Sequence, residues 1–289
     1  MKPRQLSVLL LAAFVLFFRP PMVDAQEVTF EILVSFDYPG AQDTSASGIN
    51  EAGDVVGSFV NEFGETTGFI RFANGTFSDP IVHPDGVDTY LSDINNLGTI
   101  CGSYTLANTY HGFFLSGSTF TNFDLRADNT LIRSVNDAGN FCGTTIEQAF
   151  VSIDGNIEKF DIPKQAITVA SGINNLNQLV GRGAWLQTEY SFRRNADGKL
   201  DWPIKAPGFK NTGMFGLDDK GRMVGFVTHP DANTQATFLR PSHRFAYFTY
   251  PGAIFTEFTD INNRGKICGV YDTPDLKQHG FIVRVRGDD

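Results

Sequence analysis

One ten-residue segment recurs six times along this chain, and this repetition limits the folds that the chain can adopt. The copies align without gaps, and their third residue is Asn50, Asn95, Asn136, Asn174, Asp218 and Asn262. The successive spacings are 45, 41, 38, 44 and 44 residues. A period of about 40 residues is typical of repeat architectures, in which each unit buries its apolar surface against the next unit.

The third position of the repeat is a turn-forming position. Its single replacement is Asp218, and aspartate shares with asparagine a side-chain oxygen that accepts hydrogen bonds from backbone N–H groups two residues on. Three residues later stands a glycine in five copies and Asn177 in the other, which favours a left-handed backbone there. The pattern predicts a type I turn closed by a left-handed residue, as in a three-residue β-hairpin. The glycines are Gly53, Gly98, Gly139, Gly221 and Gly265.

Each predicted hairpin leads into a strand that is apolar on both faces. Two apolar residues precede the glycine that ends every copy, as in Val55-Val56 before Gly57. Consecutive strand residues point to opposite sides, so both sides must be covered. A propeller blade lies between two neighbouring blades, whereas a two-sheet sandwich with one wet face would show alternation. The repeat therefore predicts an all-β fold, a six-bladed β-propeller. The final glycine indicates close approach of a neighbouring backbone or ring.

Each unit holds enough short strands for a four-stranded blade. An aromatic strand such as 112–114 follows the hairpin, and a further strand then ends in a Pro-rich or Asp-rich corner such as 250–252. The last copy stops at Val285 after three strands, while the segment 28–36 precedes the first copy as a spare fourth. We therefore expect the N-terminal strand to complete the last blade and close the ring, which removes exposed edges.

The first residues have the pattern of an export signal. Lys2 and Arg4 precede the apolar run 6–18, and small residues lead to a cleavage site near Ala25. The run is shorter than the ~20 residues of a membrane-spanning helix, although an uncleaved anchor is the alternative. We expect a signal peptide, 1–25, and a single six-repeat propeller domain, 26–289, that is secreted or periplasmic.

The formal net charge of −9 argues against two classes of partner. An acidic surface repels phosphate backbones and anionic membranes, and no cluster of Lys and Arg counteracts this locally. We therefore expect no nucleic acid and, after cleavage of the signal, no membrane as partner. The sequence leaves the oligomeric state open.

Two copies carry a triplet that resembles a known family. His111-Gly112-Phe113 and His279-Gly280-Phe281 resemble the motif of the extracellular HAF-repeat family, secreted proteins named for a His-Ala-Phe triplet. The likeness spans nearly all of the chain after the signal, but Thr67, Gln148 and Tyr190 replace the histidine in other copies. The resemblance implies secretion and a repeat-built β fold, and it implies no particular activity.

The cysteines and the acidic turns indicate no metal or cofactor. Cys101, Cys142 and Cys268 share one repeat position with valines of other copies, so we expect small buried core residues with free thiols. The loops 93–96 and 260–263 resemble oxygen-rich calcium loops, but each holds only one carboxylate in a short turn. We interpret them as hairpin turns and leave calcium binding open.

No catalytic group can be nominated from the sequence. The five histidines are scattered, without the spacing of a zincin helix or a nucleophile elbow. Aromatic residues in the variable loops are candidates for stacking on a sugar. The candidate ligand-binding residues are Tyr104, Tyr110, Trp185 and Tyr190.

Three functions remain open at this point. The first is a non-catalytic binding or scaffold module for a glycan or an extracellular protein on one face of the propeller. The second is a propeller enzyme, a hydrolase or lyase acting on extracellular polysaccharide, which would require convergent carboxylates, histidines or arginines around the central opening. The third is a structural envelope protein.

Overall fold

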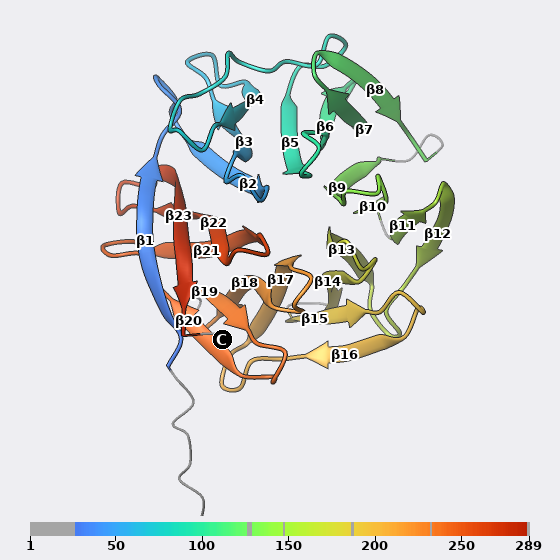
Figure 1. Cartoon of the computed structure of the whole chain (residues 1–289), viewed down its shortest axis with the longest axis vertical. Helices are drawn as coiled ribbons and strands as arrows, with labels where there is room; N and C mark the ends of the chain where they lie inside the picture. The colour runs from blue at the N-terminus through green and yellow to red at the C-terminus, as the bar shows by residue number, and fades with distance from the viewer. Residues whose placement is uncertain (1–26, 126–128, 147, 186–187, 232, 288–289) are drawn as a thin grey trace, which may run out of the picture.

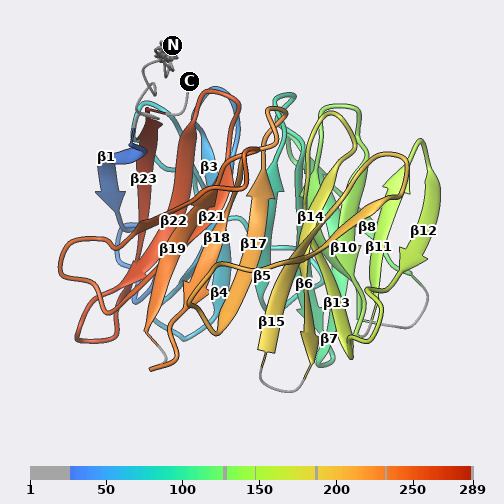
Figure 2. The same ribbon diagram turned by 90° about the horizontal axis from the view of Figure 1, so that it is seen from below.

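The computed structural model describes residues 27–125, 129–146, 148–185, 188–231 and 233–287. Within these ranges the chain forms β-strands and no helix, and the sheets radiate from a central axis (Figure 1). Seen from the side, they stand face to face (Figure 2). The prediction of an all-β propeller is confirmed. The predicted signal peptide, 1–25, lies outside the described residues, and those described include no helix suited to crossing a membrane.

The strands occupy four successive positions from the axis outward. The inner strands are β2 (Thr44–Ile49), β5 (Thr89–Ile94), β9 (Leu131–Val135), β13 (Ile167–Ile173), β17 (Asn211–Leu217) and β21 (Phe255–Ile261). The second are β3 (Val55–Val60), β6 (Ile100–Leu106), β10 (Phe141–Thr144), β14 (Leu179–Trp185), β18 (Met223–Thr228) and β22 (Lys266–Asp272). The third are β4 (Thr66–Arg71), β7 (Thr109–Ser116), β11 (Ala149–Ile153), β15 (Thr188–Arg194), β19 (Thr234–Leu239) and β23 (Gln278–Arg286). The outer are β8 (Thr119–Phe123), β12 (Asn156–Phe160), β16 (Leu200–Ile204), β20 (Phe245–Phe248) and β1 (Thr29–Phe36).

The sheets depart in two places from six separate sheets of four strands. Three sheets have four antiparallel strands, whereas β2–β4 form a three-stranded sheet. The segment outside β4 forms isolated bridges to it at Phe77 and Ile81 and no continuous ladder, and Pro80 between them lacks the N–H that such a ladder needs. One eight-stranded sheet contains both β17–β20 and β21–β23 with β1, because the parallel pair of Thr234 and Phe255 links β19 to β21.

Strand β1 lies beside β23, the last strand of the chain. The two pair antiparallel from Thr29 opposite Arg286 to Phe36 opposite Gly280, with a register shift near Ile32. β1 therefore holds the outer position that β8, β12 and β16 hold in their sheets (Figure 1). Its side chains join the core, since the ring of Phe30 lies 5.2–6.1 Å from three other phenylalanine rings.

The phenylalanine of each aromatic strand is buried between sheets. Phe113 and Phe281 are 0% exposed, as are the equivalent residues of the other four units. The glycine of the second strand makes room for this ring and for the inner strand. A Cβ added at Gly102 would lie 2.1 Å from the carbonyl oxygen of Tyr90 and 2.8 Å from the ring of Phe113. The predicted close approach of backbone and ring at this glycine is confirmed.

A buried threonine at the start of each inner strand fixes the link from the preceding outer strand. In every unit its hydroxyl accepts a hydrogen bond, at 2.8–3.1 Å, from the backbone N–H of the corner residue. A hydroxyl that accepts this bond satisfies a donor that would otherwise be buried without a partner. The threonines are Thr44, Thr89, Thr130, Thr168, Thr212 and Thr256, and each is at most 1% exposed.

Removing one of these hydroxyls tests their contribution to stability. We expect Thr212→Val to lower the free energy of unfolding by about 1–3 kcal/mol, because the N–H of Ala206, itself 0% exposed, loses its acceptor. Urea denaturation measures the change. The same substitution at the exposed Thr121 of β8 should shift the unfolding free energy by less than about 0.5 kcal/mol. Equal effects at the two sites would contradict this assignment.

Candidate functional site

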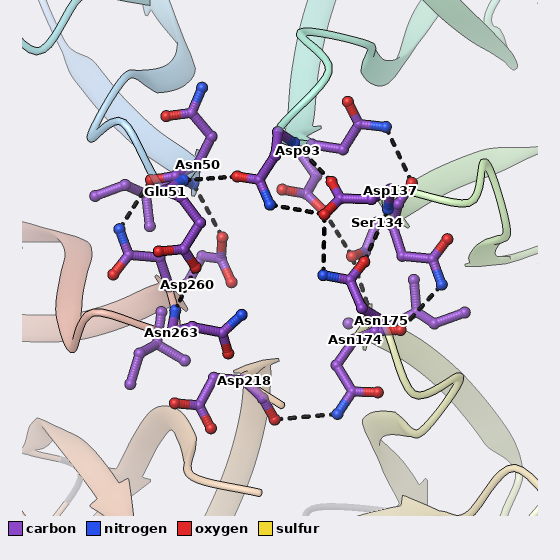
Figure 3. Close-up of a pocket in the computed structure, with 18 of the residues that line it drawn as sticks. Asn50, Glu51, Asp93, Ser134, Asp137, Asn174, Asn175, Asp218, Asp260 and Asn263 are labelled. Atoms are coloured by element: carbon purple, nitrogen blue, oxygen red, sulfur yellow. Dashed lines mark hydrogen bonds between the residues drawn. The ribbon is translucent and has the colours of Figure 1, made fainter. Parts of the chain in front are cut away.

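The six repeat turns converge at one end of the axis. Each third-position side chain accepts bonds from its own turn, as Asn95 Oδ1 does from the N–H groups of Leu97 (3.0 Å) and Thr99 (2.9 Å). The closing residue is left-handed, with φ of +79° at Gly98 and +58° at Asn177. This is the hydrogen bonding that the repeat predicts. The turns line a small cavity of about 70 Å³ (Figure 3).

The fourth position of the repeat forms a closed ring of hydrogen bonds. Each backbone N–H donates to the side-chain oxygen of the next unit at 2.7–2.9 Å, and the last bond returns from Asn263 to Glu51. Acids and amides alternate, so an amide such as Asn175 can also donate to the carboxylate of Asp137 (3.0 Å). The sequence analysis missed this ring, although the alternation is visible in the repeat. Its members are Glu51, Asn96, Asp137, Asn175, Asp219 and Asn263.

The third position adds a second set of bonds between units. The amide of Asn136 donates to the backbone oxygen of Asn174 (3.0 Å), and Asn95, Asn174 and Asn262 make the equivalent bond. Asp218 has no amide to donate. Its carboxylate instead pairs with Arg222, which donates to the backbone oxygen of Asn263 (3.3 Å). The unit with Asp218 in place of asparagine is therefore still linked to the next unit, through the side chain of Arg222.

Two carboxylates lie deeper in the small cavity. Asp93 accepts bonds from the Ser134 hydroxyl (2.6 Å) and the Val135 N–H (3.1 Å), and Asp260 accepts from the Ile49 N–H (2.9 Å). Burial raises the pKa of Asp93 and, further, that of Asp260, to which the charge of Asp93 adds. Both acids therefore bond to the backbone of the next unit.

The polar groups of the small cavity are engaged with one another. The ring acids accept from backbone and amide donors, and the deeper acids accept from the neighbouring unit. In the ranges that the structure describes, no three His, Cys, Asp or Glu side chains are grouped to hold a metal ion. The small cavity is therefore best explained as the junction between units.

A second, larger cavity of about 420 Å³ lies in the channel around the first halves of the inner strands. Every inner strand has a β-bulge one residue before the repeat begins, where the register skips a residue. Bulges redirect side chains and are common beside functional sites. The cavity volume is within the range of small-molecule sites. The six bulge residues all line it: Ser47, Ser92, Arg133, Ser171, Phe215 and Thr259.

Two neighbouring bulge residues present buried polar atoms without a partner. Arg133 makes no hydrogen bond or ion pair with the described residues, and its Nε is buried. Burial and, next, the charge of Arg182 hold the pKa of Arg133 below its usual value. The hydroxyl of Ser171 is likewise buried and unpartnered. Unsatisfied buried polar groups are costly, so each one requires an explanation.

Arg182, on β14, brings a second positive charge to the cavity. Its guanidinium carbon lies 5.2 Å from the ring centre of Phe215, and its Nε is 3.7 Å from the carboxylate of Glu189. This ion pair is long and partly exposed, so it contributes little and leaves the guanidinium available.

Glu257, on β21, is the acid of the cavity wall with the most perturbed titration. Burial raises its pKa to about 7, against the lowering effect of Arg182 and with smaller raising effects of Glu189 and Asp272. No described residue donates a hydrogen bond to its carboxylate. A cavity carboxyl that titrates near neutral pH can exchange a proton with a ligand.

The three tyrosine candidates, which the structure describes, contact different neighbours. Tyr104 is 3% exposed, and its ring is stacked on His83 at 3.6 Å. Tyr110 is 37% exposed and lies 6.1 Å from the ring of Tyr90, which lines the larger cavity. Tyr190 packs beside Trp202 and Lys205. The side chain of Trp185 lies outside the described part of the chain. As ligand contacts, all four stay predictions.

The histidines of the two triplets join the third strand to the outer strand. His111 Nδ1 lies 2.9 Å from Asp124, and His279 Nδ1 lies 2.8 Å from Asp37. Gln148 makes the equivalent bond to Asp161 at 2.7 Å, so a neutral side chain can fill the same position. The cysteines Cys101, Cys142 and Cys268 are free and fully buried, and burial raises the pKa of each thiol.

Comparison with known proteins identifies the fold. No family model and no curated protein matches the sequence. A putative TolB from Agrobacterium tumefaciens has a TM-score of 0.60 at 9% identity, over 90% of this chain and 99% of that one. A catalytically inactive virginiamycin B lyase from Staphylococcus aureus, solved with quinupristin, has 0.51 at 14%, over 89% and 99%. Regucalcin, a calcium-binding protein from Agrobacterium tumefaciens, has 0.53 at 10%, over 90% and 95%. The shared feature is the propeller fold.

The titration of Glu257 makes stability depend on pH. Because its pKa is about 7 in the folded protein against an ordinary 4.5, ionisation opposes folding, and stability is lost as pH rises through this interval. We expect the Glu257→Gln variant to match the wild type near pH 4.5 and to exceed it at pH 8 by on the order of 2–3 kcal/mol in unfolding free energy.

Urea denaturation at pH 4.5, 6 and 8 measures this difference. Glu65→Gln, the same substitution on an exposed hairpin, controls for the change in net charge. A difference between wild type and Glu257→Gln that stays constant with pH would contradict the assignment.

Proposed function

We propose that this protein is an exported, six-bladed propeller, its last blade completed by β1, that binds a carboxylated sugar of an extracellular glycan in the larger cavity without transforming it. The closed ring of six turns and the pairing of β1 with β23 support the architecture. The N-terminal sequence supports export, and the His-Gly-Phe triplets support kinship with the HAF-repeat family.

The observation that carries this proposal is the unpartnered guanidinium of Arg133. Arg133 lies half-buried without a counter-ion, and a ligand carboxylate would supply the missing charge and a bidentate partner. The chain as a whole is acidic, with a net charge of −9, yet the cavity lining contains two arginines. These arginines supply positive charge for an anion beside the two acids of the lining, Asp43 and Glu257.

The remaining cavity wall suits a sugar. Serine and threonine hydroxyls line it, including the unpartnered hydroxyl of Ser171, and they can exchange hydrogen bonds with sugar hydroxyls. The rings of Phe215 and Tyr90 offer apolar faces beside them. An anionic group, several hydroxyls and an apolar ring face occur together in uronic acids.

An enzyme acting on acidic polysaccharide, a hydrolase or a lyase, is the second candidate. Glu257 favours it, because a carboxyl with a pKa of about 7 suits general acid–base catalysis. The fold does not decide, since the similar structures include both a lyase and a calcium-binding protein. Chain shortening or new unsaturated products from polygalacturonate would favour the enzyme. If the protein were a structural envelope protein, the third candidate, it would show no affinity for acidic sugars.

Arg133→Gln tests the binding proposal directly. We expect the variant to bind D-galacturonate oligosaccharides about 10- to 100-fold more weakly than the wild type, because a charge-assisted contact contributes about 1.5–3 kcal/mol. Isothermal titration calorimetry measures the affinity. Uncharged galactose oligosaccharides should bind weakly to both proteins.

Stability separates a functional effect from damage to the fold. Arg133 has no described partner to lose, so Arg133→Gln should unfold at the same temperature as the wild type or higher. Lys199→Gln, which removes an exposed positive charge, should leave the affinity unchanged. Unaltered galacturonate binding by Arg133→Gln would refute the proposed site.

A further inference from the structure

Three of the four charged side chains that line the larger cavity have no strong partner. Arg133 has no described partner, and Glu257 accepts no described hydrogen bond. Arg182 has only the long contact of 3.7 Å with Glu189. Arg182 acts electrostatically on both other groups, since its charge lowers the pKa of Arg133 and that of Glu257. Arg182 is therefore coupled electrostatically to both Arg133 and Glu257.

We propose that Glu257 is a specificity-determining residue that sets how many anionic groups the cavity accepts. When Glu257 is ionised, its charge offsets that of Arg182, and Arg133 binds one carboxylate. When Glu257 is protonated, it no longer offsets the charge of Arg182, and Arg182 binds a second one. The inference rests on the proposed function and adds to it the charge of the preferred ligand. At acidic pH, the preferred ligand is a sugar with two acidic groups.

The groups around Glu257 support this role for it rather than for a neighbour. Arg182 of β14, Glu189 of β15 and Asp272 of β22 are the charged groups that act on it. Glu189 is directed to Arg182 Nε, and Asp272 accepts a bond from the Gln278 amide at 3.2 Å. Asp43, which also lines the cavity, accepts a bond from the Gln278 N–H at 2.9 Å. Glu257 is thus the cavity carboxyl left without a donor.

The direction of coupling follows from electrostatics. A second ligand carboxylate beside Arg182 adds negative charge near Glu257, which favours the protonated form of Glu257. Binding of a dianion should therefore take up a proton from solution, whereas binding of a monoanion at Arg133 should take up little. By linkage, affinity for the dianion must fall as pH rises through the titration of Glu257.

The test compares galacturonate, with one carboxylate, and galactarate, with two, by calorimetry at pH 5.5 and 8.5. Sugar carboxyls titrate near ~3.5, so both ligands stay ionised throughout. For the wild type we expect galactarate affinity to fall at least tenfold between the two pH values and galacturonate affinity to fall less than threefold. At pH 7, buffers of different ionisation enthalpy should report proton uptake with galactarate.

Two variants make the outcome specific. Glu257→Gln should bind galactarate at pH 8.5 as tightly as at pH 5.5 and take up no proton, while Glu65→Gln should keep the wild-type profile. Suppose that galacturonate binds but galactarate affinity does not change with pH, or that its pH dependence persists in Glu257→Gln. Either result would overturn this inference and leave the proposed function intact. Failure of both acids to bind the wild type would overturn the proposed function and this inference with it.

Discussion

The closed ring of hydrogen bonds between successive repeat turns is the interaction on which the rest of the structure depends. A blade buries both faces, so it has no stable surface until its neighbours are in place. The bonds from backbone N–H to the next side chain specify how each neighbour is placed, and the bond from Asn263 to Glu51 joins the last unit to the first. The seam between the chain ends therefore has the same chemistry as the other junctions, and the pairing of β1 with β23 reinforces it from the outside.

The ring also explains why the unpartnered polar groups of the channel lie elsewhere on the axis. At the turns, the oxygens that face the centre are consumed in holding the units together, including those of Asp93 and Asp260. One residue before the repeat, the bulge takes a side chain out of the ladder between strands and points it to the channel. Because this side chain lies outside the ladder, its identity can differ from unit to unit. Serine, threonine, phenylalanine and arginine all occur there.

This division determines what could be predicted from the sequence. The turn residues, the buried strands and the glycine beside each buried phenylalanine recur in every copy, because the same packing requires them each time. The bulge residue is not constant, although it is serine in three copies, so a comparison between copies discards Arg133 as variation. Glu257 has an altered pKa only through its surroundings, which are built from β14, β15 and β22. Tyr104 could not be recognised as a packing residue, because the stacking of His83 on its ring depends on how the link before β5 folds back.

The two cavities of the channel differ in how their charged groups are paired. These groups have partners in the smaller cavity, and most of them lack a strong partner in the larger one. In the smaller cavity, acids are matched by amides and backbone donors, and even the aspartate that replaces an asparagine brings an arginine, Arg222, to restore the link. In the larger cavity, Arg133 and Glu257 lack any such match among the described residues, although the same strands could have supplied one. Leaving polar groups unpartnered in the larger cavity costs free energy, and an external group that completes them would recover it. The proposed ligand would supply the partner that the fold does not give to Arg133.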